Sequence, residues 1–285
     1  MYTMVGIIGL AVLWIGGITL SSGLALASKV SLPAAAFDAR GGDAARGKHL
    51  VEAVMACSRC HGADLGGAPL VRGAVGRIDA PNLTPGGPLR TFSDADFERA
   101  IRHGVAPGGT RLYYMPSFSY AVLSDADLRD TIAYLRSLPP VERASAPRAI
   151  GFGGRMMAVT HELPAAADEI DQNAGHAAAQ AAGPTPGYGK YLARIGGCVQ
   201  CHGADFAGGR YAVPPDGPAA PNLTPAALAS WTPAQFAAAL RTGRAPGGRV
   251  LDSAMPWRNF SAMNDDEVAA LYAFLKTVPP VKSDG

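Results

Sequence analysis

Apolar residues recur at helical spacing near residue 130, and the same pattern returns about 140 residues later. Leu128, Ile132 and Leu135 are three or four positions apart, which predicts one apolar face of a helix. Ser124 suits the N-cap of this helix, and the double proline that begins at Pro139 predicts its end. The second stripe consists of Val268, Leu271, Tyr272 and Leu275, with a cap at Asn264 and a stop at Pro279.

Two shorter segments also carry helix signals at equivalent places. Ser93 with Asp96, and Thr232 with Gln235, have the spacing of a capping box, and Pro233 suits the first helical position. Segments that begin at Gly47 and Gly189 are predicted to run as short helices toward a pair of cysteines. No alternating strand pattern of useful length is present, so the predicted fold class is mainly α. The apolar positions expected on the faces of the two capped helices are Phe97, Ile101, Phe236 and Leu240.

Residues 1–28 contain no charged side chain. The stretch from Val5 to Ala27 is long enough to span a hydrocarbon core of about 30 Å as a helix. A secretory signal cut after Ala27 is the alternative. We expect an uncleaved transmembrane anchor, because a basic start is lacking and the apolar run exceeds a usual signal core.

The chain is a tandem duplication, which organises the rest of the sequence. Pro-Asn-Leu-Thr-Pro at 81–85 returns at 221–225, and Ala-Pro-Gly-Gly at 106–109 returns at 245–248. Each repeat has about 100 residues, enough for a modest core. The predicted organisation is an anchor or signal at 1–28, a linker at 29–40, repeats at 41–141 and 187–285, and an interdomain linker at 142–186. Within that linker, residues 150–157 are apolar enough to dock on a repeat or a partner.

Composition supports a folded body outside the membrane. The net charge is +2 with 25 basic and 23 acidic residues, so no nucleic-acid-binding patch is predicted. The four cysteines fall in two motifs that give them another role, and no structural disulfide is expected.

Those motifs are two copies of Cys-x-x-Cys-His, at residues 57–61 and 198–202. This is the attachment signature of c-type haem: two thiols form thioethers to one porphyrin, and the adjacent imidazole falls on one axial side of the iron. A zinc site would need four ligands, and no second cysteine pair completes either motif. A dithiol redox pair needs no histidine and normally lies in a βαβ pattern, which is absent. Two covalently bound haem c groups are therefore predicted, attached at Cys57, Cys60, Cys198 and Cys201, with His61 and His202 as iron ligands.

Two methionines are the predicted sixth ligands of the irons. Met115 and Met255 occupy equivalent places in the repeats, and each precedes a proline, which favours an extended loop over a helix interior. A thioether ligand also raises the reduction potential relative to a second imidazole. The other histidines do not recur between the repeats and are predicted to be surface or capping residues. They are His49, His103, His161 and His176.

Iron with both axial positions filled argues against a catalytic haem such as that of a peroxidase.

Polar residues near the predicted haem sites have two interpretations. The Asn and Thr of each Pro-Asn-Leu-Thr-Pro segment can donate to haem propionates or fix a carbonyl near the iron-binding imidazole, and ordinary turn chemistry is an equal alternative. Arg111 and Arg249 can neutralise propionates or be solvated. The Asn and Thr residues are Asn82, Thr84, Asn222 and Thr224.

With these motifs in order, residues 41–285 resemble the c-type cytochrome subunits of bacterial membrane-bound dehydrogenases, such as those for alcohol and gluconate. The resemblance rests on Cys-x-x-Cys-His, Pro-Asn-Leu-Thr-Pro, the Phe-Ser-Asp-Ala-Asp-Phe run at 92–97, the Met-Pro loop and the closing segment at 134–141. It implies tandem class I cytochrome c domains, covalent haem at the four cysteines, and axial roles for His61, Met115, His202 and Met255. Many such subunits carry three haems, whereas this chain has two motifs.

The resemblance also implies a non-catalytic electron-transfer subunit that receives electrons from a dehydrogenase and passes them to quinone or a terminal oxidase. The alternative is a dihaem subunit of a terminal oxidase or another respiratory complex, fed by a soluble cytochrome. A two-haem peroxidase or thiosulfate-oxidising cytochrome is a third interpretation. Because haem attachment is completed outside the cytoplasmic membrane in bacteria, we expect an inner-membrane protein with its haem domains in the periplasm.

Overall fold

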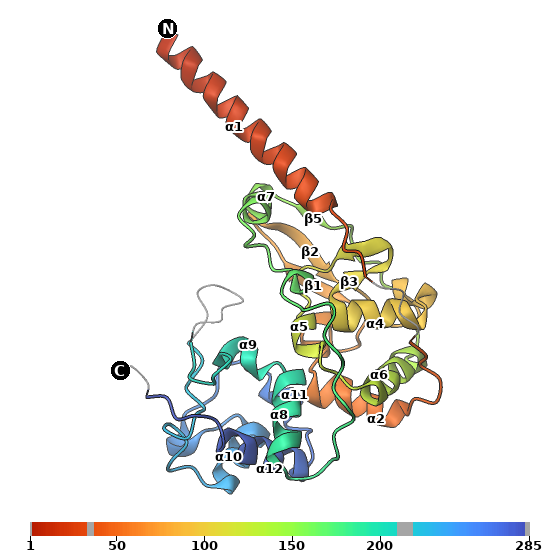
Figure 1. Cartoon of the computed structure of the whole chain (residues 1–285), viewed down its shortest axis with the longest axis vertical. Helices are drawn as coiled ribbons and strands as arrows, with labels where there is room; N and C mark the ends of the chain where they lie inside the picture. The colour runs from red at the N-terminus through yellow and green to blue at the C-terminus, as the bar shows by residue number, and fades with distance from the viewer. Residues whose placement is uncertain (1, 33–36, 210–218, 283–285) are drawn as a thin grey trace. The chain divides into compact units, whose positions relative to one another are not determined.

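The computed structural model describes residues 2–32, 37–209 and 219–282 (Figure 1). Part of the predicted 29–40 linker, and parts of the second repeat, lie outside these ranges. The chain forms two compact units, which are described in turn. The first comprises Met1–Ala36, Cys60–Ser117 and Pro139–Gln172, and the second comprises Phe37–Arg59, Phe118–Leu138 and Asn173–Gly285.

The described part of the first unit combines helices with short strands. Its helices are α1 (Tyr2–Ala27), α4 (Asp94–His103) and α7 (Phe152–Val159), and 3₁₀ turns lie at η2 (Pro88–Thr91), η3 (Pro107–Gly109) and η4 (Ala166–Asp168). Its strands are β1 (Ala68–Val71), β2 (Gly76–Ala80), β3 (Val105–Ala106), β4 (Thr110–Arg111) and β5 (Ala149–Ile150).

The described part of the second unit is helical apart from isolated bridges. From the first repeat it takes α2 (Ala44–His49), the π-helical turn η1 (Leu50–Val54) and α6 (Asp125–Ser137). From the second repeat it takes α8 (Pro186–Ile195), α9 (Cys198–His202), α10 (Pro233–Thr242), η5 (Pro246–Gly248), α11 (Trp257–Phe260) and α12 (Asp265–Leu275). The short helices α3 (Ser58–His61) and α5 (Ser117–Tyr120) begin in one unit and end in the other.

The predicted helix caps are confirmed. Ser93 and Thr232 form capping boxes at the starts of α4 and α10, and Pro233 occupies the first turn of α10. Ser124 caps α6, and Asn264 forms a capping box on α12. The stripes that these caps introduce are largely buried, with Leu128 and Ile132 fully inaccessible. The mainly helical fold class therefore follows from local patterns that the structure reproduces.

The strands were not predicted. β1, β2 and β5 form an antiparallel sheet in that order, with a bulge between Pro69 and Val71. The longest strand, β2, has five residues, of which Ile78 and Ala80 are buried. Such short strands do not carry enough alternating positions to give a period-two signal. The sheet also draws β5 from the predicted interdomain linker, so part of that linker is ordered on the first unit.

Helix α7 comes from the apolar segment of the same linker. Figure 1 shows it beside α1, and the two helices pack together within the first unit. The guanidinium of Arg155 donates to Ser22 Oγ at 3.1 Å, and the rings of Trp14 and Phe152 lie 6.2 Å apart. The prediction was docking on a repeat or a partner. The segment instead packs mainly on α1, which lies outside both repeats, and it also contacts β2 of the first repeat.

Helix α1 contains 26 residues, and Leu10, Leu13 and Leu24 on it are each more than two-thirds exposed. Within the part of the chain that the structure describes, no helix meets the length and hydropathy required to cross a membrane. The transmembrane anchor therefore stays a prediction.

In the second unit, the first and last helices of each repeat cross at a glycine. α2 packs on α6, and α8 packs on α12. A Cβ atom at Gly47 would overlap the carbonyl oxygen of Asp130, and one at Gly189 would overlap that of Ala270. Glycine permits this close approach of the two backbones. The duplicated sequence thus builds the same helix crossing twice.

Candidate haem sites

The histidine of each Cys-x-x-Cys-His motif is buried and oriented by a backbone carbonyl. His61 is 7% exposed and its Nδ1 lies 2.8 Å from the carbonyl oxygen of Pro81, while His202 is 6% exposed and its Nδ1 lies 2.8 Å from that of Pro221. Because a carbonyl only accepts, Nδ1 carries the proton in both rings. The lone pair of the neutral imidazole is then on Nε2, which is the form that binds a metal ion.

Burial also favours the neutral imidazole. It lowers the pKa of His61 and of His202, and the bond to the carbonyl opposes this effect in each case. A metal-binding histidine must be neutral, so the folded chain prepares both rings for coordination.

The Pro-Asn-Leu-Thr-Pro segment that supplies this carbonyl is fixed by its own polar side chains. In the first repeat, Asn82 donates to the carbonyl of Val141 at 2.7 Å and accepts from the amide of Thr84 at 2.9 Å. The hydroxyl of Thr84 in turn accepts from the amide of Val141 at 3.0 Å. Both side chains are fully buried. They therefore hold the carbonyl beside the imidazole, which was one of the predicted roles.

The second repeat reproduces this network. Asn222 donates to the carbonyl of Val281 at 2.7 Å and accepts from the amide of Thr224, also at 2.7 Å. The hydroxyl of Thr224 accepts from the amide of Val281 at 3.2 Å. In both copies, the segment after the last helix is tied to the loop that orients the histidine.

A cavity of about 410 Å³ lies in the second repeat, with a mostly apolar lining. Cys198, His202 and Met255 all line it, so three of the four predicted haem residues of this repeat meet at one space. Its volume is in the range of small-molecule and cofactor sites. Aromatic side chains that line it are Phe206, Trp231, Phe236 and Phe260.

The donor groups at this cavity fit a covalently attached haem. All four cysteines of the chain are free thiols. Burial raises the pKa of the Cys198 thiol to about 12 and raises that of Cys201, so both are protonated and neutral near pH 7. One thiol, a neutral imidazole and a thioether line the apolar space, and the second thiol of the motif lies on the same short helix, α9. These are the groups that haem c requires.

The two predicted propionate partners differ in the structure. Arg249 lines the cavity of the second repeat. Arg111 instead forms an ion pair with Asp168 at 2.8 Å and donates to the carbonyl of Ser28 at 3.0 Å, within the first unit. Sequence gave no sign of this pairing, because Asp168 belongs to the predicted linker.

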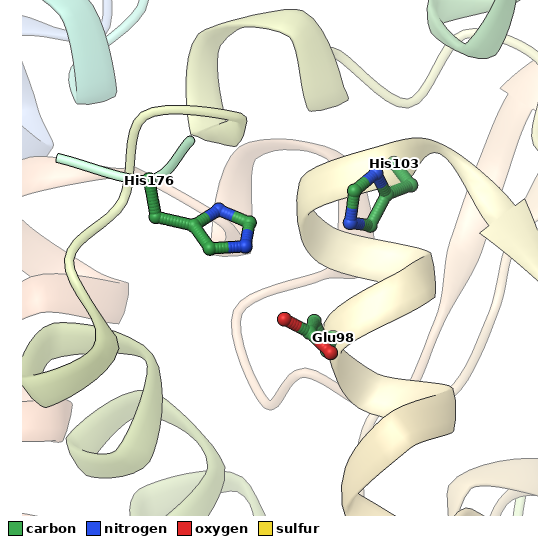
Figure 2. A group of neighbouring side chains, drawn as sticks. All are labelled: Glu98, His103 and His176. Carbon is green, nitrogen blue, oxygen red and sulfur yellow. The ribbon is translucent and has the colours of Figure 1, made fainter. Parts of the chain in front are cut away.

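Two of the remaining histidines, His49 and His103, contact side chains outside these motifs. Figure 2 shows His103 on α4 together with Glu98, and Nδ1 of His103 lies 2.7 Å from Oε1 of Gln172. His176, also labelled in Figure 2, belongs to the second unit. His49 Nε2 lies 2.8 Å from a carboxylate oxygen of Glu267. Nothing in the sequence pattern predicted this last contact.

Within the second unit, segments of the two repeats contact each other at equivalent positions. His49 of the first repeat contacts Glu267 at the start of α12. At the position equivalent to His49, Tyr191 donates its hydroxyl proton to Asp127 at the start of α6. Asp127 and Glu267 both lie three residues after a helix cap, so the contacts are reciprocal. This reciprocity is the pattern of a two-fold interface.

Two buried, carbonyl-oriented histidines in duplicated cytochrome motifs are features of an electron carrier of the c-type cytochrome class. Comparison with known proteins agrees. Residues 42–135 match the family model of cytochrome c oxidase, cbb3-type, subunit III, and residues 186–279 match that of cytochrome c.

Comparison with individual relatives narrows the class of protein to a family. The chain is 30% identical to a diheme cytochrome c-type protein of Cereibacter sphaeroides over 96% of its own length and 98% of that relative. It is 31% identical to the gluconate 2-dehydrogenase cytochrome c subunit of Pantoea cypripedii over 82% of its length and 59% of the relative. It is 39% identical to the cytochrome c subunit of the quinone alcohol dehydrogenase of Gluconacetobacter polyoxogenes over 33% of its length and 22% of that relative.

The chain belongs to the family of two-domain, c-type diheme cytochromes, which is similar to the cytochrome subunits of these dehydrogenases. It is an electron carrier that binds haem c, and its relatives are cytochrome subunits, not catalytic ones. The resemblance stated from the sequence motifs is confirmed.

Proposed function

We propose that this cytochrome is the electron-transfer subunit of a membrane-associated respiratory oxidoreductase, relaying electrons from a dehydrogenase to quinone or a terminal oxidase. The observation that carries the proposal is the duplicated site: two buried histidines, each with Nδ1 fixed by a Pro-Asn-Leu-Thr-Pro carbonyl. Relatives that are cytochrome subunits of gluconate, alcohol and fructose dehydrogenases support a dehydrogenase as the electron donor.

The proposed cofactors are two covalently bound haem c groups. When bound, each haem supplies one-electron redox chemistry. The chain's own residues fix the imidazole tautomer, exclude water with an apolar wall, and offer a thioether that favours ferrous iron. The attachment residues are Cys57, Cys60, Cys198 and Cys201, and the axial ligands are His61, Met115, His202 and Met255.

The proposed location is the inner membrane of a bacterium, with α1 as a single anchor and the haem domains in the periplasm. The absence of charge from residues 1–28 and the exposure of leucines along α1 support this proposal. Bacteria complete covalent haem attachment outside the cytoplasmic membrane, which also supports haem domains in the periplasm.

A second candidate function is a dihaem subunit of a terminal oxidase that accepts electrons from a soluble cytochrome. It is favoured by one observation, the match of the first repeat to subunit III of cbb3-type cytochrome c oxidase. The two candidates differ in the protein that copurifies and in the direction in which electrons enter.

Affinity purification of the tagged full chain from detergent-solubilised native membranes tests the proposal. We expect a flavin, quinoprotein or molybdenum dehydrogenase to copurify, and the substrate of that enzyme to reduce the haems of the complex. A matched chain in which residues 2–27 are replaced by a cleaved secretory signal is expected in the soluble periplasmic fraction. A copurifying copper and haem oxidase core would instead support the second candidate, and washed membranes that release the full chain would contradict the anchor.

A further inference from the structure

The two residues between the cysteines of the first haem motif contact the second repeat, within the second unit of the fold. Asn259, on α11, donates to Ser58 Oγ at 2.9 Å and to the carbonyl of Glu52 at 2.8 Å. The guanidinium of Arg59 donates to the carbonyl of Ala254. Ala254 directly precedes Met255, the proposed iron ligand of the second haem.

The second haem motif makes the equivalent contact with the first repeat, but through an uncharged side chain. In the second motif, Gln200 occupies the position of Arg59, and its side-chain amide donates to Ser119 Oγ at 3.1 Å. Ser119 lies four residues after Met115, as Asn259 lies four residues after Met255. Each motif thus contacts the segment beside the other repeat's methionine, and only the first brings a cation.

The loop that presents Met255 is otherwise fixed by local bonds. The amide of Ala254 donates to Oδ1 of Asp252 at 2.7 Å, and the amide of Met255 donates to the carbonyl of Asp252 at 3.1 Å. The bond from Arg59 is the contact by which the first haem motif reaches this loop. Arg59 is exposed, so solvent screens its charge in part.

The guanidinium of Arg59 donates to the carbonyl of the residue before Met255, so its charge lies beside the loop of the proposed second haem ligand. A cation near a redox centre favours the reduced state, because reduction adds one negative charge to that centre.

We infer that Arg59, a residue of the first haem motif, is a positioning residue for the second haem site: it holds the Met255 loop and raises the reduction potential there. The inference rests on the proposed haem sites. It means that a residue of one haem motif tunes the other haem site. The effect is one-sided, because the equivalent residue, Gln200, is neutral.

Redox titration of the haem-loaded full chain tests this inference. The substitutions are made in a Met115→His background. A second imidazole lowers the reduction potential of the first haem, so the reduction step at higher potential belongs to the second haem. In that background we expect Arg59→Gln to lower the equilibrium constant for reduction in the upper step about threefold, which is about 30 mV at 59 mV per tenfold. Arg59→Lys keeps the charge and should retain most of the potential.

Lys190→Gln is the matched control, since it removes an exposed cation of α8 in the same unit. An upper step unchanged by Arg59→Gln, or shifted equally by Lys190→Gln, would overturn the role of Arg59. Haem content and the charge-transfer band of Met-ligated ferric haem are measured on every variant, so that loss of a site is seen separately. If Met115→His does not alter the titration, Met115 is not the iron ligand. The role of Arg59 is then tested by Arg59→Gln in the otherwise unaltered chain. There, two unchanged midpoint potentials overturn it.

Discussion

The two histidines have the same surroundings although the repeats differ at most positions. In each, a proline carbonyl accepts from Nδ1 at 2.8 Å, and a glycine with positive φ follows the ring: Gly62 at 83° and Gly203 at 80°. Positive φ at these positions explains why glycine stands after both histidines. The local backbone therefore reproduces the geometry that the imidazole needs, independently of the residues packed around it.

Replacement of either proposed methionine should affect one haem only. We expect Met255→Ala and Met115→Ala each to abolish the charge-transfer band of Met-ligated ferric haem at one site and to lower one midpoint potential, because a neutral thioether that favours ferrous iron is lost. Visible spectroscopy with redox titration measures both effects.

Met263→Leu is the control for this experiment. Met263 lines the same cavity and is buried, but no proline follows it and no methionine stands at the equivalent place in the first repeat. A volume-conserving change there should cost less than about 1.5 kcal/mol and leave the band intact. If the band survived in Met255→Ala and was lost in Met263→Leu, the ligand would be Met263.

The sequence predicted the chemistry of single residues but not their distant partners, as Asn82 illustrates. Its place in a repeated motif indicated a role near the haem, with propionates and a backbone carbonyl as alternatives. In the structure, the side-chain amide of Asn82 donates to the carbonyl of Val141, which lies beyond the last helix of the repeat. No local pattern links those two positions, because the connection depends on where the chain returns after folding.

At the scale of elements, the helices follow from capping and periodicity, whereas the helix crossings do not. Gly47 and Gly189 lie inside α2 and α8, where alanine would be favoured by about 1 kcal/mol. The crossing explains both: the backbones of α6 and α12 occupy the space of a side chain. The strands were missed for a related reason, since β5 forms only where a linker segment meets β2.

We expect Gly189→Ala to destabilise the folded protein by about 2 kcal/mol, because a methyl group would push α8 away from Ala270 on α12. Denaturant unfolding of the haem-loaded protein measures the change. Gly187→Ala lies in the same helix with open space around it, and should be neutral or stabilising. Equal effects of the two substitutions would show that helix propensity, not the crossing, sets the result.

At the scale of the whole molecule, the duplication is used twice: it provides two haem motifs, and it provides reciprocal contacts between segments of the repeats. The second use was not predictable, because the equivalent residues are chemically different. His49 and Tyr191 share a position, and the lack of a repeated histidine indicated a surface or capping role. In the structure both side chains reach a carboxylate of the other repeat.

The reciprocal contacts should differ in their response to pH. The hydrogen bond that His49 donates to the carboxylate of Glu267 raises the pKa of His49, while burial and the nearby Arg46 oppose the rise. A raised pKa in the folded state means that this stabilisation is complete below the ordinary histidine pKa of about 6.5 and is lost as pH rises through the raised value. For Tyr191, burial raises the pKa above its ordinary value, so the hydroxyl remains protonated over this range.

Unfolding free energies of the full chain between about pH 5 and pH 9 test this difference. The contribution of the His49–Glu267 contact should fall by about 0.5 kcal/mol as pH rises, a small value because the pair is partly exposed to solvent. Burial lowers the pKa of His61 and His202, which act in the opposite direction, so the contribution is measured as the difference between wild type and His49→Gln. His49→Gln should remove that pH-dependent component, and Tyr191→Phe should lower stability by a constant amount. A pH profile that His49→Gln leaves unaltered would exclude the contact with Glu267 as its source.

The bond between each Pro-Asn-Leu-Thr-Pro segment and the valine after the last helix has a consequence for handling the protein. In the second repeat, Val281 holds Asn222 and Thr224, and the same loop supplies the carbonyl that orients His202. Proteolytic cleavage between α12 and Val281 would release this loop without removing any iron ligand. Such a preparation would keep its haem, yet its second site would titrate heterogeneously.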